Sequence, residues 1–167
     1  KSGDIDLLSK IIKPNIGIIT HIGHSHLEGL NSVNGVLRVK SELIKNIKKD
    51  GIAIVPDGKY LNYWKSMRKD IAFYSFGEKS SASYFPSQIK MTKHGLSFFI
   101  ESHHLKKRVS IKTKLIGVHN VLNILASFAA IHSANLNVER FSDNLKDLQN
   151  HSQRLGIKKW VKQSNVI

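Results

Sequence analysis

The sequence predicts an α/β fold with a mostly parallel sheet flanked by helices. A β-branched run at 16–22 and apolar segments at 52–55 and 71–76 are typical of buried parallel strands, and segments of helical periodicity lie between them. This β-α-β-α-β alternation implies right-handed crossover connections within one sheet. A length of 167 residues fits one domain.

Three helices are predicted around these strands. The first follows Asp4 and ends before Pro14, because proline cannot continue a helix. The second begins after Ser32, a residue suited to N-capping, and ends before Gly51. Its apolar stripe consists of Val36, Val39, Leu43, Ile44 and Ile47. The third is expected at 60–68.

The pattern changes after Gly77. Segments 88–92 and 96–101 flank a short turn that contains Gly95, a residue suited to positive φ, and segment 108–112 alternates with period two. We therefore expect a small antiparallel β segment, at about 84–113, attached to the main sheet.

The last part of the chain returns to helical periodicity. A strongly apolar helix is predicted from Val118 to Ile131, and a second one over 138–148. A strand follows at 157–161, and the chain ends in what resembles another strand at 165–167. Because an unpaired apolar strand invites aggregation, this ending predicts a fragment of a longer protein.

Composition excludes several classes of protein. The chain has no cysteine, which excludes disulfides and thiolate metal sites, and it has no apolar run long enough to span a membrane. There is no signal-peptide core, so we expect a cytoplasmic protein. The net charge of +14 favours polyanionic partners, although a lysine-rich proteome is the plainer explanation. The charge alone suggests a nucleic-acid-binding module as an alternative. The aromatic residues do not interleave with the basic ones as a base-stacking surface would require, so no nucleic acid is expected as a partner.

A histidine-rich loop follows the first strand. His21, His24 and His26 fall within six residues, and imidazole is the commonest ligand of zinc. A three-histidine site would need a sharp turn, which Gly23 allows, whereas ordinary surface histidines are the simpler interpretation. Glu28 would either ligate the metal or orient a ligating side chain through a hydrogen bond. Alternatively, it would cap the next helix.

Two further groups of polar residues belong to helices. Lys40 and Glu42 lie downstream of the histidine loop, where an ordinary solvated charge or ion pair is the simplest interpretation. His119, Asn120 and Asn123 open the apolar helix, where they would bind an anion or an adenine edge, or merely cap the helix. The chain contains no GxxxxGK[ST] phosphate loop and no nucleophile elbow.

Four blocks of sequence, in order, resemble the central domain of the Mur ligase family. The central block is GIITHIGHSHLEGLNSVNGVLRVKSEL at 17–43. The others are KSGDIDLLSKIIKPNIG at 1–17, Phe76-Gly77 followed by Ala82-Ser83-Tyr84, and GVHNVLNILASFAAI at 117–131. The His26-Leu27-Glu28-Gly29 motif is most similar to the branch that adds D-Ala-D-Ala to UDP-N-acetylmuramoyl-tripeptide.

The resemblance implies an ATP- and Mg²⁺-dependent amide-bond ligase of peptidoglycan precursor synthesis that works through an acyl phosphate. It implies that His26 and a carbamylated Lys40 ligate magnesium. Glu28 and Glu42 are candidates for carboxylates that orient these ligands. The nucleotide would be bound by His119, Asn120, Asn123 and Arg154.

The resemblance also bears on domain organisation. It implies that residues 1–167 form part of the central ATP-binding domain. The UDP-substrate domain, the phosphate loop and the carboxyl-terminal domain would lie outside this chain, so we expect no ligase activity from it alone and a monomeric enzyme.

The sequence departs from the family pattern in the histidine loop. His21 replaces a usual Asn, and His24-Ser25 replaces a common Pro-Ala, while His26 and Lys40 stay in register. Three alternatives stay open: another Mur ligase, a folylpolyglutamate synthase-like enzyme, and a degenerate scaffold domain.

Overall fold

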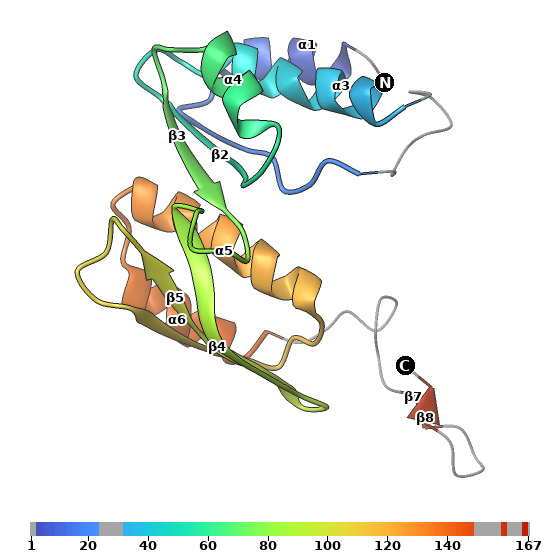
Figure 1. Cartoon of the computed structure of the whole chain (residues 1–167), viewed down its shortest axis with the longest axis vertical. Helices are drawn as coiled ribbons and strands as arrows, with labels where there is room; N and C mark the ends of the chain where they lie inside the picture. Colours follow the sequence, from blue (N-terminus) through green and yellow to red (C-terminus); the bar gives the residue numbers. More distant parts are fainter. Residues whose placement is uncertain (1–2, 24–31, 149–157, 160–164, 167) are drawn as a thin grey trace.

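A six-stranded sheet organises the protein. The computed structural model describes residues 3–23, 32–148, 158–159 and 165–166 (Figure 1). The six strands follow one another across the sheet in chain order. The predicted α/β architecture is confirmed.

The first three strands are parallel, as predicted. They are β1 (Ile16–Ile18), β2 (Ile52–Pro56) and β3 (Ala72–Phe76), with Gly17 opposite Ala53 and Ala53 opposite Phe73. The predicted strand 16–22 is therefore too long, because the chain stops pairing with β2 in the ladder after Ile18 and turns into a loop.

The antiparallel strands continue the same sheet. They are β4 (Tyr84–Thr92), β5 (Gly95–Ser102) and β6 (Val109–Thr113), and β4 joins β3 through one parallel pair, Phe76 opposite Tyr84. Gly95 has the predicted positive φ of 147°, and a Cβ there would lie 2.0 Å from the carbonyl oxygen of Thr113. The predicted appendage is thus the antiparallel half of one sheet.

Helices cover both faces of the parallel strands. In Figure 1, α1 (Asp4–Ile12), α3 (Val33–Lys45) and α4 (Leu61–Met67) lie on one side, and α5 (Val118–Ser133) lies on the other. Ser32 caps α3 as predicted, because its hydroxyl accepts a 3.1 Å hydrogen bond from the amide of Gly35. The last helix, α6 (Val138–Leu145), contacts α5 and β6.

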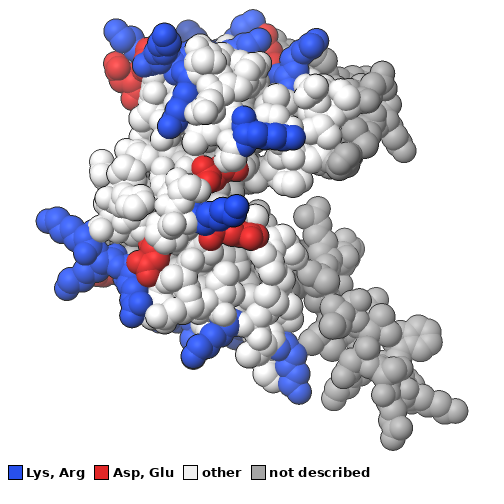
Figure 2. All heavy atoms as spheres, viewed as in Figure 1, with Lys and Arg blue, Asp and Glu red and all other residues white. Residues whose placement is uncertain are grey.

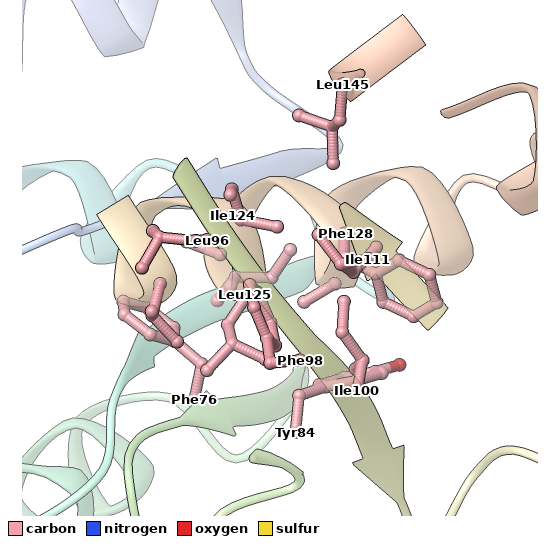
Figure 3. Packing of buried hydrophobic residues seen from close by; sticks show 14 residues of the cluster. Phe76, Tyr84, Leu96, Phe98, Ile100, Ile111, Ile124, Leu125, Phe128 and Leu145 are labelled. Carbon is pink, nitrogen blue, oxygen red and sulfur yellow. The ribbon is translucent and has the colours of Figure 1, made fainter. Parts of the chain in front are cut away.

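Alternating side chains of β2 divide the core into two layers. Ala53 and Val55 point toward α3 and α4, while Ile54 packs with the side chains of α5. Figure 3 shows the α5 layer of the core, in which Phe76, Phe98 and Leu125 belong to one cluster of buried side chains. Because side chains pack on both faces, the parallel strands are mostly apolar, which is what made them recognisable in the sequence.

The remaining described segments are short. β7 (Lys158–Lys159) and β8 (Asn165–Val166) form a separate antiparallel pair. In the part of the chain that the structure describes, no helix is both long and apolar enough to cross a membrane.

A tyrosine–histidine pair lies at the carboxyl end of α5. The Tyr84 hydroxyl lies 2.7 Å from Nδ1 of His132, and the ring of His104 lies near Tyr84. Burial raises the pKa of Tyr84 to about 12, so its hydroxyl keeps its proton and can donate to a neutral His132. Burial, assisted by the nearby His104, lowers the pKa of His132.

We expect His132 to make stability fall in mild acid. Since its folded-state pKa lies below its ordinary value of about 6.5, the unfolded chain takes up the proton first, and stability is lost as pH falls below that value. His132→Gln should show a smaller loss of melting temperature between pH 7.5 and 5.5 than the unmodified protein. The control His94→Gln, in an exposed turn, should behave like the unmodified protein; equal losses in all three would contradict the role of His132.

Candidate nucleotide site

A hollow of about 490 Å³ opens at the carboxyl ends of the three parallel strands. This is the edge at which open α/β sheets bind their ligands. Its walls come from the segments after β1, β2 and β3 and from the first turns of α5. The lining residues are Thr20, His21, Pro56, Asp57, Gly58, Phe76, Gly77, Glu78, Lys79, Ser81 and Leu122. We call this hollow the strand-end pocket.

Lys40 reaches the rim of this pocket from α3. Its Nζ donates a hydrogen bond to the carbonyl oxygen of His21, which itself lines the pocket. The side chain is half-buried, and burial lowers the pKa of Lys40. Within the described residues Lys40 forms no ion pair, so the simple interpretation of a surface salt bridge finds no support.

Glu42 turns away from Lys40. Its carboxylate accepts hydrogen bonds from the backbone amides of Gly3 at 3.0 Å and Asp6 at 3.1 Å, which are free donors at the start of α1. It thus caps a neighbouring helix and tethers α1 to α3. The structure does not bring Glu42 together with Lys40.

Asp57 lines the strand-end pocket but was not among the site residues predicted from the sequence. Its amide donates to the carbonyl of Phe76 at 2.8 Å, and its Oδ2 accepts from the Ser81 hydroxyl at 2.7 Å. A Cβ at Gly77 would lie 3.0 Å from that of Asp57, so a glycine allows this close approach. Its position directly after a buried parallel strand was the signal that could have identified it.

The amino-terminal part of α5 forms another wall. Leu122 lines the strand-end pocket, while His119 and Asn123 are exposed. Asn120 is half-buried, and its Nδ2 donates to the carbonyl of Ile116 at 2.7 Å. The alternative that these side chains cap α5 finds no support. Gly117 occupies the N-cap position, and no side chain caps the helix there.

Apolar and acidic side chains share the strand-end pocket. Phe76, Pro56 and Leu122 supply apolar surface, Asp57 and Glu78 supply carboxylates, and Lys79 supplies one ammonium group. Carboxylates repel phosphate groups but accept hydrogen bonds from hydroxyl and amino groups. With two carboxylates against one lysine, such a lining suits the nucleoside part of a nucleotide better than its phosphates.

A family model for the Mur ligase middle domain matches residues 1–131. The chain therefore belongs to the Mur ligase family. Among the relatives of this Mur ligase chain, a UDP-N-acetylmuramoyl-tripeptide--D-alanyl-D-alanine ligase from Buchnera aphidicola subsp. Baizongia pistaciae is 34% identical over 167 residues. That match covers 98% of this chain and 35% of the relative. The Mur ligase chain thus spans about a third of the length of the curated relatives that it matches.

Solved structures agree with the Mur ligase fold. A crystal structure of MurF from Acinetobacter baumannii matches with a TM-score of 0.85 and 26% identity, and covers 96% of this chain and 35% of that protein. A MurF ligase from Thermotoga maritima in complex with ADP matches with a TM-score of 0.76 and 20% identity. This match covers 95% of this chain and 36% of that protein. The second likeness supports the fold alone.

Several predicted Mur ligase site residues lie outside the described residues. These are His24, His26, Glu28 and Arg154. Among the residues that are described, no group of three His, Asp or Glu side chains could hold a metal ion. The hypothesis of a three-histidine zinc site, which includes His21, therefore stays untested.

Proposed function

We propose that this chain is the ATP-binding part of a cytoplasmic, monomeric ligase that adds D-Ala-D-Ala to UDP-N-acetylmuramoyl-tripeptide. Relatives that match nearly the whole chain carry the name of this activity. The observation that carries the proposal is the position of Lys40, half-buried, free of any described carboxylate and attached to the rim of the strand-end pocket.

The reaction has two group transfers. The terminal phosphoryl group of ATP passes to the substrate carboxylate, so that a P–O bond to ADP breaks and an acyl phosphate forms. The amine of the dipeptide then attacks the acyl carbon, the amide bond forms, and inorganic phosphate leaves. Both steps need neutralised negative charge and aligned reactants.

Lys40 fits the proposed role in magnesium binding only after chemical modification. A lysine ammonium would repel a divalent cation, whereas a carbamate supplies oxygen ligands, which magnesium prefers. Carbamylation requires a neutral amine, and burial, by lowering the pKa of Lys40, makes that form more accessible. Lys40 and His26 would hold magnesium, which when bound supplies charge stabilisation for phosphoryl transfer.

The strand-end pocket would receive the nucleoside of ATP. Asp57 is held in place by Ser81 and the Phe76 carbonyl, so its carboxylate is a preorganised acceptor for hydroxyl or amino groups. Asn120 and Asn123 on α5, together with His119 and Arg154, complete the proposed nucleotide-binding set.

The decisive experiment measures phosphate release by the complete gene product that contains this chain. The assay contains ATP, magnesium and UDP-N-acetylmuramoyl-tripeptide, with or without D-alanyl-D-alanine. Release that requires the dipeptide would establish the activity, and a parallel assay with UDP-N-acetylmuramate and L-alanine in place of the tripeptide and the dipeptide would detect an L-alanine-adding activity instead. A folded protein that binds nucleotide but releases no phosphate under any condition would refute the proposal in favour of a scaffold.

A further inference from the structure

A second hollow, of about 420 Å³, lies at the opposite ends of the parallel strands. Six of its nine lining residues are lysine or arginine. The nine are Lys10, Lys13, Lys45, Asn46, Ile47, Lys48, Lys49, Arg68 and Asp70. In Figure 2, basic side chains gather along the upper edge of the molecule, where Figure 1 places α1, α3 and α4. We call this hollow the basic pocket.

The floor of the basic pocket is fixed by two polar side chains. Nδ2 of Asn46 donates to Oδ1 of Asp6 and to the Ser9 hydroxyl, both at 2.9 Å, and so joins α3 to α1. Nη1 of Arg68 donates to the carbonyl of Lys45 at 2.7 Å, and so joins the end of α4 to the end of α3. The hollow is therefore preformed by contacts among three helices.

The local carboxylates are already neutralised by other residues. Arg68 holds Asp70 through two hydrogen bonds of 2.7 and 2.8 Å, and Lys10 pairs with Asp6 at 2.7 Å. Hydrogen bonding to Arg68 is the main reason that the pKa of Asp70 is lowered, and the charge of Lys49 adds to it. Four pocket lysines have no ion pair within the described part of the chain: Lys13, Lys45, Lys48 and Lys49.

Helix stability explains only some of these lysines. Lys45 lies in the last turn of α3 and Lys13 follows α1, where cations interact favourably with the helix dipole. Lys48 and Lys49 lie beyond the end of α3, so the dipole gives no reason for them. Their mutual repulsion around a concave surface would be relieved by a bound anion.

We propose that the basic pocket binds a compact anion bearing two or more phosphate groups. Lysine ammonium groups are suitable point-charge donors for phosphate oxygens. The lining contains no aromatic side chain and only one apolar one, Ile47, so it offers nothing on which a nucleobase could stack. A polyphosphate or a doubly phosphorylated small molecule therefore fits the pocket better than nucleic acid.

The basic pocket is separate from the strand-end pocket. Lys48 and Lys49 precede β2, whereas Asp57 follows it, and the five residues of β2 span roughly 15 Å. Substitutions in the basic pocket therefore leave the proposed nucleotide site in place. The two proposals can fail independently.

The test compares two pairs of exposed lysines in the complete gene product. Lys48→Gln/Lys49→Gln removes two charges from the basic pocket, and Lys106→Gln/Lys107→Gln removes two from the exposed loop between β5 and β6. Binding of inorganic tripolyphosphate is measured by titration calorimetry at two salt concentrations, in the presence of ADP and magnesium so that the proposed nucleotide site is already occupied. We expect the pocket variant to bind this anion at least about 10-fold more weakly and the loop variant less than about 2-fold more weakly, with affinity falling as salt rises.

Three results would overturn the proposal. Equal weakening in both variants would mean that diffuse charge, and not the pocket, attracts the anion. The absence of tripolyphosphate binding by the unmodified protein would mean that there is no such site. Tighter binding of random single-stranded DNA, lost equally in both variants, would support a nucleic-acid surface instead. Circular dichroism of each variant verifies that the fold is retained.

Discussion

Lys40→Ala should lower the turnover of the complete ligase by about 10²- to 10³-fold while the protein stays folded. If Lys40 supplies carbamate oxygens to the metal, its loss removes several kcal/mol of transition-state stabilisation, and each 1.4 kcal/mol corresponds to a factor of ten in rate. Alanine is the strongest helix former, so α3 should persist, with only the hydrogen bond to the His21 carbonyl lost. Steady-state phosphate release measures the effect.

A matched control separates this effect from loss of a positive charge. Lys65→Ala removes an exposed lysine of α4 and should leave turnover within about 2-fold. Carbamylation itself is tested by removing dissolved carbon dioxide, which should lower the turnover of the unmodified enzyme, and by adding bicarbonate, which should restore it. Near-normal turnover of Lys40→Ala, or no response to bicarbonate, would exclude the carbamate role.

Local patterns in the sequence predicted most elements of the fold. The apolar and aromatic segments predicted β2 and β3, and the Ser32 cap predicted the start of α3, because these features depend on residues close together in the chain. The single pairing of Phe76 with Tyr84, which joins the two halves of the sheet, has no comparable local signature. Its position depends on α5, which contacts strands of both halves.

The candidate site was predictable to a smaller extent. Lys40 was selected through the family resemblance, and in the structure its Nζ donates to the carbonyl of His21, a residue that lines the strand-end pocket. The capping of α1 by Glu42 joins residues 39 positions apart, and helical spacing alone cannot show such a contact. Asp57 is not predictable as a site residue from local patterns, because its contacts with Phe76 and Ser81 form only when β3 and the following loop are in place.

Trp64 should be the most costly side chain to truncate in the layer between the sheet and α3. It is fully buried, its ring packs near Tyr60 at 6.1 Å, and its Nε1 donates to the Ser41 hydroxyl at 2.8 Å. Trp64→Ala should therefore lower the free energy of unfolding by about 3–5 kcal/mol, because it removes both the buried ring and the cavity-filling contacts around it. Urea denaturation measures the loss.

Trp64→Phe separates packing from hydrogen bonding. Phenylalanine retains most of the apolar volume and loses only the indole donor, and the Ser41 hydroxyl can still donate to the carbonyl of Leu37 at 2.6 Å. Its cost should be about 1–2 kcal/mol. A loss below about 1 kcal/mol for Trp64→Ala would show that the layer collapses around the gap. Since Ser41 adjoins Lys40 on α3, a folded Trp64→Phe protein with normal turnover would also show that the position of Lys40 does not depend on this hydrogen bond.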